Sequence, residues 1–212
     1  MGFKVFKVDT LLETVRFEIK KTKDSQSHFA LQGVSLENDD PGLVYHSIGV
    51  NGAKVASFLR CQKFTPHLSA LHPDLVIISL GTNDAYFYNF NEGEYKKNLN
   101  ELIDMIRQAS PETSILLTAP GDGMRSKWQL NQNYEKAKNI LVNVAHTRNC
   151  GFWDFYDVMG GIKSIQTWAA YGLSKTDYLH LTADGYKLQG ELLFRALILE
   201  EYFAEHQQIT GN

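Results

Sequence analysis

Short apolar runs alternate with amphipathic patterns along most of the chain after Pro41, and this alternation limits the fold more than any other feature. The run 75–80 is almost wholly apolar and follows the breaker His72-Pro73-Asp74, which is typical of a strand buried on both faces of a parallel sheet. Further strands are predicted at 43–48, 115–119 and 152–155, and helices at 52–59, 92–109, 134–148 and 182–205. We therefore predict an α/β fold, a three-layer α/β/α sandwich with a mostly parallel central sheet.

The residues before Pro41 follow a different pattern. Runs 12–20 and 28–36 contain Val, Phe, Ile and Thr and are separated by the polar stretch 21–27, which predicts two strands joined by a turn. Because a two-stranded hairpin is only marginally stable alone, these strands need a sheet to join or a domain surface to cover. The chain is thus expected to divide into a β-strand segment, residues 1–41, and an α/β domain, residues 42–212.

Charge and hydropathy exclude two classes of partner. The formal net charge is -3, the pI is about 6.2, and Lys and Arg are scattered, so no nucleic-acid partner is predicted. No apolar stretch approaches the roughly 20 residues that cross a bilayer, so no transmembrane segment is predicted. The first residues lack the apolar core of a signal peptide, so either the protein is cytoplasmic or this chain begins downstream of its gene start.

The spacing of the histidines and cysteines indicates neither a metal site nor a disulfide framework. The seven histidines and two cysteines show no metal-ligand pattern, so neither a metal nor another cofactor is predicted. Cys61 and Cys150 are interpreted as two small buried apolar residues, and whether they pair stays open.

Two polar segments follow predicted strands. In segment 47–53 a strand runs into a helix through Gly49 and Gly52; glycine lets the backbone approach a ligand closely, and a helix N-terminus presents unpaired N–H groups. In segment 79–84, Asn83 can aim its amide N–H at a developing oxyanion. Taken singly, the first segment reads equally well as a tight turn and the second as a helix cap.

A third segment contains Asp177 and His180. Their spacing of three lets the carboxylate fold back onto the imidazole, which fixes the tautomer and stabilises the imidazolium formed when the ring accepts a proton. A single histidine before a helix is more often structural. Reactive groups of open α/β sheets gather beyond the carboxyl ends of the strands, however, and three such segments together favour an active site.

These residues carry a resemblance to a known family. Gly52, the Gly81-x-Asn83-Asp84 loop and the Asp177-x-x-His180 pair match, in order, the second, third and fifth sequence blocks of the SGNH (GDSL-like) hydrolase superfamily, over about residues 42–203. The resemblance implies a flavodoxin-like fold. It also implies that the Gly52 N–H and the Asn83 side chain line an oxyanion hole, and that His180, oriented by Asp177, activates a serine.

The serine block of that family, Gly-Asp-Ser, is absent from this sequence. Gly121-Asp122-Gly123 is a near-miss that reads as a loop, and Ser25 is the best substitute within the chain. A bacterial subgroup of the family offers another explanation, because its Gly-Asp-Ser strand lies far upstream of a β-sandwich. Residues 1–41 would then be the remnant of an inserted or preceding β-rich domain, and the central sheet would have a gap. Three readings stay open: the nucleophile lies upstream of residue 1, is Ser25, or is absent.

The resemblance implies an ester hydrolase that removes a small acyl group, such as acetyl, from a carbohydrate or cell-wall glycan by a Ser-His-Asp mechanism. The expected partners are the acylated substrate and the missing N-terminal segment or β-rich domain of the same protein. The subgroup suggests export of the full-length protein to the periplasm or cell surface.

The alternative function is a non-catalytic module that binds a glycan or a partner protein. Tyr86 and Tyr88, with Phe87 and Phe90, would form a wall for a sugar or acyl chain, or would pack their loop onto the domain. In either case the chain by itself is expected to show little or no esterase activity.

Overall fold

The computed structural model describes residues 4–10, 12–126 and 129–207, with side chains described up to residue 198. The chain divides into two compact units, Met1–Gly49 and Val50–Asn212, and each is described by itself. Residues 1–3 and 11 of the predicted N-terminal segment lie outside the described residues.

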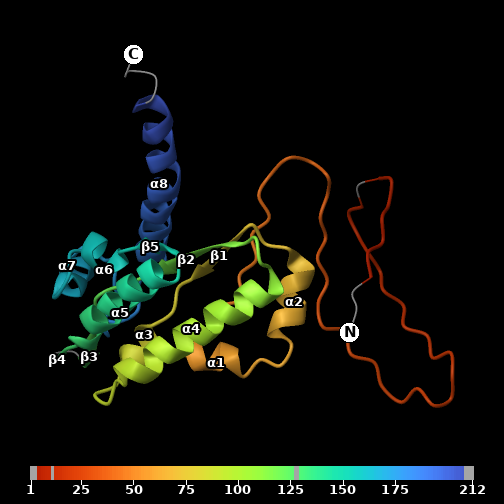
Figure 1. Ribbon diagram of the computed structural model, residues 1–212, viewed down its shortest axis with the longest axis horizontal. Helices are drawn as coiled ribbons and strands as arrows, with labels where there is room; N and C mark the ends of the chain where they lie inside the picture. Colours follow the sequence, from red (N-terminus) through yellow and green to blue (C-terminus); the bar gives the residue numbers. More distant parts are fainter. Residues whose placement is uncertain (1–3, 11, 127–128, 208–212) are drawn as a thin grey trace. The chain divides into compact units, whose positions relative to one another are not determined.

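The second unit is built on a three-stranded parallel sheet (Figure 1). Its strands are β1 (Leu75–Ile78), β2 (Ser114–Thr118) and β5 (Gly151–Trp153), in the order β1-β2-β5. Val76 pairs with Ile115, and Leu117 pairs with Phe152. The predicted α/β fold with a parallel sheet is therefore confirmed.

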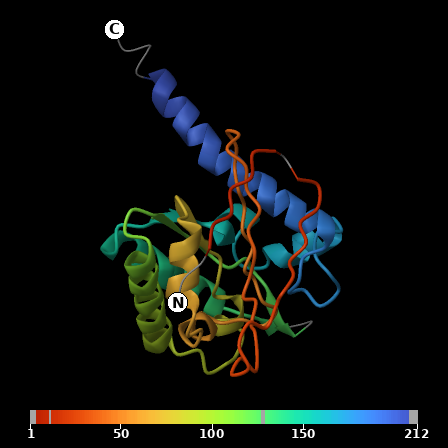
Figure 2. The ribbon, with the colours of Figure 1, turned by 90° about the vertical axis from the view of Figure 1, so that its right-hand side faces the viewer.

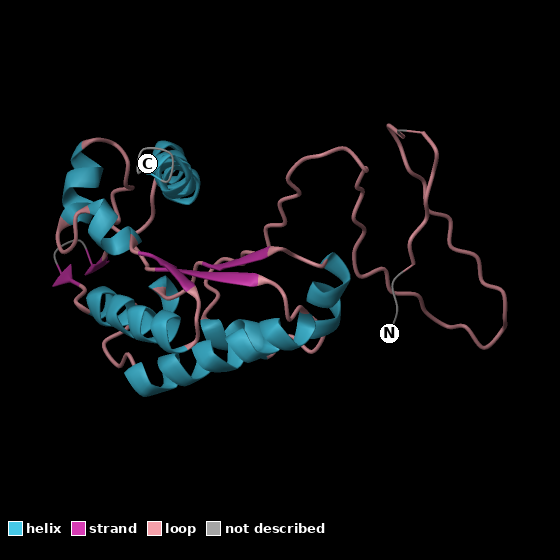
Figure 3. Ribbon diagram, turned by 45° about the horizontal axis from the view of Figure 1, so that its top comes forward, coloured by secondary structure: helices cyan, strands magenta, loops and turns pink. Residues whose placement is uncertain are grey.

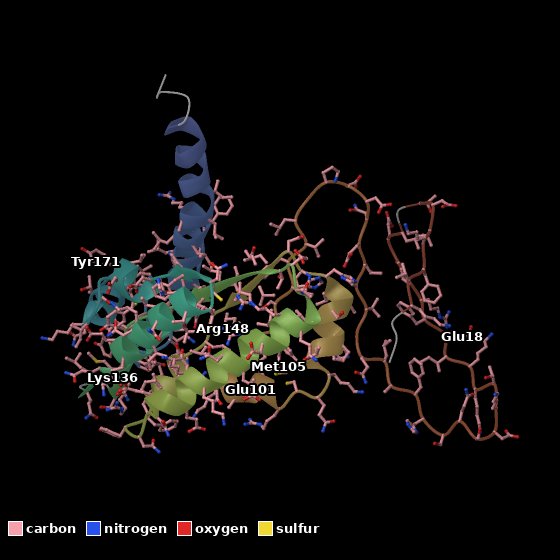
Figure 4. The ribbon with its side chains drawn as sticks, in the orientation of Figure 1. Glu18, Glu101, Met105, Lys136, Arg148 and Tyr171 are labelled. Atoms are coloured by element: carbon pink, nitrogen blue, oxygen red, sulfur yellow. The ribbon has the colours of Figure 1, made fainter. Side chains whose placement is uncertain are left out.

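Four helices cover one face of this sheet (Figure 3). They are α1 (Val55–Leu59), α2 (Phe64–Leu71), α4 (Glu92–Ala109) and α5 (Asn133–Thr147). Leu99 and Ile103 of α4 pack with Ile78 and Leu117 of the strands in one apolar cluster. Ion pairs join α4 to α5: Lys136 near the start of α5 lies 3.3 Å from Glu92, and Arg148, directly after α5, pairs with Asp104. Figure 4 labels Lys136 and Arg148.

The opposite face is covered by α6 (Phe155–Met159), α7 (Ser164–Ala170) and α8 (Ala183–Gln207). Leu116 and Trp153 of the strands pack there with Ile165 and Trp168 of α7, and leucines of α8 lie against them. The Thr182 hydroxyl accepts the Gly185 N–H at 3.2 Å and so caps the closing helix. The C-terminal half of α8 extends beyond the sheet (Figure 2).

Short elements complete the second unit. α3 (Thr82–Ala85) follows β1, and the antiparallel pair β3 (Met124–Ser126) and β4 (Gln129–Leu130) follows β2. The predicted strand 152–155 ends earlier, at Trp153, because the Asp154 side chain accepts the Asp157 N–H at 3.1 Å and begins α6.

The edge strand β1 is covered on one face only. It pairs with β2 alone, so its other backbone edge has no partner strand among the described residues. Ile78 points into the cluster beneath α4 and is 4% exposed, whereas Leu75 and Ile77 on the other face are 41% and 37% exposed. Apolar side chains at an unpaired edge are unusual in a parallel sheet, which normally has both faces covered.

The first unit contains no helix or strand within residues 4–10 and 12–49. The strands predicted at 12–20, 28–36 and 43–48 are therefore absent. Because a strand forms only beside another strand, an alternating apolar pattern cannot become a sheet where no partner pairs with it. One turn is held by the Gln26 N–H, which donates to the Lys23 carbonyl at 3.1 Å.

The cysteines differ from the expectation of burial. Cys61 is exposed and Cys150 is partly buried, and neither belongs to a disulfide. Cys61 follows the short helix α1, where its thiol reaches the Ser57 carbonyl at 3.5 Å at the protein surface. No helix in the described part of the chain has both the length and the apolar character needed to cross a bilayer.

Candidate active site

Asp177 and His180 contact each other in a tight turn that precedes α8. The Asp177 Oδ2 atom lies 2.9 Å from the His180 Nδ1 atom, the contact that the spacing of three residues predicts. Asp177 Oδ1 accepts the N–H groups of Leu179 and His180, each at 3.0 Å. Tyr178, between them, adopts a left-handed conformation with φ of 55°, which closes the turn.

The electrostatics of this turn favour an ionised carboxylate. Partial burial acts to raise the pKa of Asp177, but the hydrogen bonds from the backbone and ring of His180 and from Leu179 outweigh it and lower the pKa below its usual value. An ionised Asp177 accepts a proton-bearing Nδ1, so the His180 Nε2 carries the lone pair. Because about half of the His180 side chain is exposed, that nitrogen is accessible to a reacting group.

Gly52 and Asn83 come together at the start of α1. The Asn83 Nδ2 donates to the Ala53 carbonyl at 2.9 Å, which leaves its second N–H for a ligand. The Asp84 carboxylate accepts the Val55 N–H at 3.2 and 3.3 Å. Burial raises the pKa of Asp84 although this hydrogen bond acts in the opposite direction. Asp84 thus holds the start of α1 against the loop that contains Asn83.

Both glycines of this region have a positive φ, which favours a residue without a Cβ. Gly52 has φ of 75°, and its N–H has no hydrogen-bond partner within the described residues. Gly81 has φ of 128°, and a Cβ there would lie 2.6 Å from the Tyr95 hydroxyl. Alanine at position 81 would therefore displace α3 and, with it, Asn83.

Hydrogen bonds through β3 connect the two halves of the site. Arg125 Nε donates to the Tyr86 carbonyl just after α3 at 3.0 Å, and the Met124 N–H donates to the Tyr178 carbonyl at 2.8 Å. The segments that hold Asn83 and His180 are both bonded to the same short strand. Asn83 contacts the Ala53 carbonyl and His180 contacts Asp177, and β3 is bonded to a residue near each of these pairs.

The aromatic residues after α3 pack onto the β3–β4 hairpin. The Tyr86 hydroxyl donates to the Arg125 carbonyl at 2.8 Å, and the Tyr88 hydroxyl is hydrogen-bonded to Gln129. The Arg125 guanidinium lies 3.8 Å from the centre of the Tyr88 ring. These contacts support the alternative that Tyr86 and Tyr88 pack their loop onto the domain. A substrate wall at Tyr86 and Tyr88 stays a prediction, and Tyr88 is 71% exposed.

Arg125 and Asn131 were missed by sequence reasoning. Asn131 is buried and its side chain donates to the Ala85 carbonyl at 3.1 Å. Both residues lie in a short polar stretch without helical or strand periodicity. No signal in the sequence marks them, because their partners lie far away along the chain.

The two serine-block candidates have different surroundings. Ser25 lies in the turn at residues 23–26 of the first unit and is exposed. Gly121-Asp122-Gly123 is a loop, as predicted, and the Asp122 Oδ2 accepts the Ile165 N–H at 3.1 Å at the start of α7. Burial raises the pKa of Asp122. No group of three His, Cys, Asp or Glu side chains suited to a metal ion occurs among the residues described.

Comparisons with known proteins agree with this fold. Residues 24–188 match the profile of the GDSL-like Lipase/Acylhydrolase family. A solved peptidoglycan O-acetylesterase is 25% identical, with a TM-score of 0.69 over 75% of this chain and 46% of its own length. The chain thus spans less than half of that protein. None of the curated proteins matches the chain.

Two further solved structures share the fold. An acetyl xylan esterase is 16% identical, with a TM-score of 0.57 over 71% of this chain and 79% of its own. An acetylxylan esterase from Geobacillus stearothermophilus is 20% identical, with a TM-score of 0.52 over 68% of this chain and 67% of its own.

Proposed function

Because the chain belongs to the GDSL-like lipase/acylhydrolase family, we propose that it supplies the general base and the oxyanion donors of a serine ester hydrolase. His180 Nε2 takes the proton of a serine hydroxyl as that oxygen attacks the ester carbonyl, and Asp177 stabilises the imidazolium. The Gly52 N–H and the Asn83 side chain donate to the oxyanion. His180 then protonates the leaving alcohol, and water releases the acyl group.

The observation that carries this proposal is the contact between Asp177 and His180. A carboxylate that is held by two backbone N–H groups, with its second oxygen 2.9 Å from Nδ1, fixes the ring in the tautomer that a general base needs. A histidine with a purely structural role would more often have its ring buried, whereas this ring is half exposed.

The nucleophile, we propose, comes from a further strand that pairs with β1 and belongs to a segment preceding this sequence in the same protein. The sequence contains no Gly-Asp-Ser. The unpaired edge of β1 and the exposed Leu75 and Ile77 side chains fit an added parallel strand. The shortness of the chain relative to the peptidoglycan O-acetylesterase is consistent with such a segment.

The proposed substrate is an ester of a small acyl group on a carbohydrate. The support is the similarity to structures named as a peptidoglycan O-acetylesterase and an acetyl xylan esterase. The lack of Gly-Asp-Ser favours a second candidate, a non-catalytic glycan- or partner-binding module. The two candidates differ in whether any form of the protein hydrolyses an ester through His180.

The experiment compares acetate release from acetylated xylan and from O-acetylated peptidoglycan by the full-length gene product and its variants. His180→Ala and Asp177→Asn should each lower kcat by about 10,000-fold or more, and Asn83→Ala by about 100- to 1,000-fold. His146→Ala, on α5, is the matched control and should leave the rate unchanged. Hydrolysis that survives His180→Ala, or no hydrolysis by the full-length product, would overturn the proposal, the latter in favour of the binding module.

A further inference from the structure

Arg125, on β3, is fixed by two hydrogen bonds from its guanidinium. Its Nε donates to the Tyr86 carbonyl at 3.0 Å and its Nη2 donates to the Asn131 Oδ1 at 2.7 Å. Asn131 is only 1% exposed, and its amide is fixed by the Ala85 carbonyl. The guanidinium plane is therefore oriented before any ligand arrives.

The charge of Arg125 is not neutralised by the protein. None of the carboxylates in the described residues forms an ion pair with Arg125. Elsewhere in the second unit, Arg148 pairs with Asp104 and Arg107 donates to backbone carbonyls. A guanidinium has five N–H groups, and the two hydrogen bonds above leave the others for a ligand. Arg125 is partly exposed and stacks on the ring of Tyr88 at 3.8 Å.

The position of Arg125 places this charge next to the catalytic turn. Met124, its neighbour in β3, donates to the carbonyl of Tyr178, which lies between Asp177 and His180. Arg125 also donates to the carbonyl of Tyr86, the residue directly after α3, the helix that contains Asn83. The guanidinium thus belongs to the strand that is bonded both to the turn of Asp177 and His180 and to the segment after α3.

We infer that Arg125 binds a carboxylate on the alcohol part of the substrate, so that the site selects acylated acidic sugars over neutral ones. A planar fork with free N–H groups matches the two oxygens of a carboxylate, and a neutral sugar hydroxyl cannot use both. The inference rests on the proposed function, because it assigns a substrate class to the same site. It makes Arg125 a specificity-determining residue.

The test measures binding to this chain by NMR titration, which needs no nucleophile. The probes are N-acetylmuramic acid and glucuronic acid, each against its own methyl ester, which has the same ring without the charge. The acids should bind about tenfold more tightly than the esters, a difference of about 1.4 kcal/mol. This preference should shrink as the salt concentration rises.

Variants separate recognition from folding. Arg125→Gln should remove the preference for the acids and leave the affinity for the esters unchanged, while Arg125→Lys keeps the charge but not the fork and should retain only part of the preference. Arg195→Gln removes the same charge from an exposed position on α8 and should leave the preference intact. Thermal unfolding of each variant verifies that it remains folded.

The inference is overturned if acids and esters bind equally, if neither binds, or if the preference persists in Arg125→Gln. Its failure is distinguishable from that of the proposed function. Hydrolysis that depends on His180 but ignores the carboxylate would leave the proposed function standing and remove the role of Arg125. Acid-selective binding without hydrolysis by any form of the protein would remove the proposed function and leave carboxylate binding by Arg125 standing.

Discussion

Strands β1 and β2 both contain an apolar run but differ in how their faces are covered. β2 lies between two strands. Its consecutive residues Leu116 and Leu117 point to opposite faces of the sheet and are 8% and 0% exposed. β1 has one neighbouring strand, and its corresponding residues Ile77 and Ile78 are 37% and 4% exposed. The face of the sheet toward α4 is thus covered over all three strands. The face toward α8 is covered over β2 and β5 but not over β1.

This difference is the basis for the proposed strand beside β1. A parallel strand at an edge leaves backbone N–H and C=O groups unpaired, and its exposed apolar side chains gain nothing from water. A further strand that joins β1 would pair these backbone groups, and a layer packed on the extended sheet would cover the side chains. The edge that lacks a neighbour belongs to the strand that leads into Gly81 and Asn83, so the added strand would end beside the proposed oxyanion donors.

The largest expected effects are on β2, where both faces are covered. Leu117→Ala and Leu116→Ala should each lower the free energy of unfolding by about 2–5 kcal/mol, because each leaves a cavity in a packed layer. Urea unfolding followed by circular dichroism measures both. A cost below about 1 kcal/mol for Leu116→Ala would mean that the layer on the side of α8 is not packed as described.

The matched pair on β1 should behave unequally. Ile78→Ala should cost about 2–5 kcal/mol, as a buried truncation does, and Ile77→Ala about 1 kcal/mol, because water already reaches its side chain. The two substitutions remove the same atoms from adjacent residues of one strand, so their difference isolates the two faces. Equal costs would contradict the description of an open face.

A polar substitution at the open face sharpens the comparison between this chain and the full-length protein. Ile77→Ser should change the stability of this chain by about 1 kcal/mol or less, but should cost clearly more in a protein that includes the proposed upstream segment, if that segment covers this face of β1. Val142→Ser, at a residue of α5 that is similarly exposed, is the control and should cost the same in both. If Ile77→Ser also costs the same in both, no strand covers β1.

The smallest expected effects come from two carboxylates of the site, whose shifts have opposite signs. Asp177 has a lowered pKa, so its stabilising contribution is present above the unfolded value near pH 4 and is lost as the pH falls through the folded value. Asp84 has a raised pKa, so its contribution is present below that value and is lost as the pH rises through the folded one.

Urea midpoints of Asp177→Asn and Asp84→Asn between pH 3 and pH 7 test these signs. The stability deficit of Asp177→Asn should grow as the pH rises from about 3 to 5, whereas Asp84→Asn should gain stability relative to the native chain over the upper part of this range. Parallel curves for the two variants would contradict the assigned environments.

Long periodic patterns were predictable from the sequence, and short elements were not. The helix expected at 92–109 is α4, Glu92–Ala109, because its apolar stripe repeats over several turns. α3, α6, β3 and β4 are too short for a period to appear, and their positions depend on caps such as Asp154 and on tertiary contacts. The strand expected at 43–48 failed for another reason, since strand formation needs a partner that the described residues lack.

The contacts within the site also differ in how far the sequence predicts them. The contact between Asp177 and His180 is local, so a spacing of three residues sufficed to predict it. The contact between Asn83 and Ala53 joins residues distant in the sequence, and only the ordered resemblance to a family indicated that these segments meet. The fixing of Arg125 by Tyr86 and Asn131 had no pattern behind it, because it arises only when β3 folds against the residues that follow α3.

The most direct test of the central claim is the rate at which this chain alone hydrolyses p-nitrophenyl acetate, compared with its His180→Ala variant. The claim is that the chain contains the base and the oxyanion donors of an ester hydrolase but no nucleophile. It predicts equal rates for the two proteins, both near the rate in buffer. Turnover by the native chain that His180→Ala abolishes would contradict the claim and would identify a serine within the chain, with Ser25 as the first candidate.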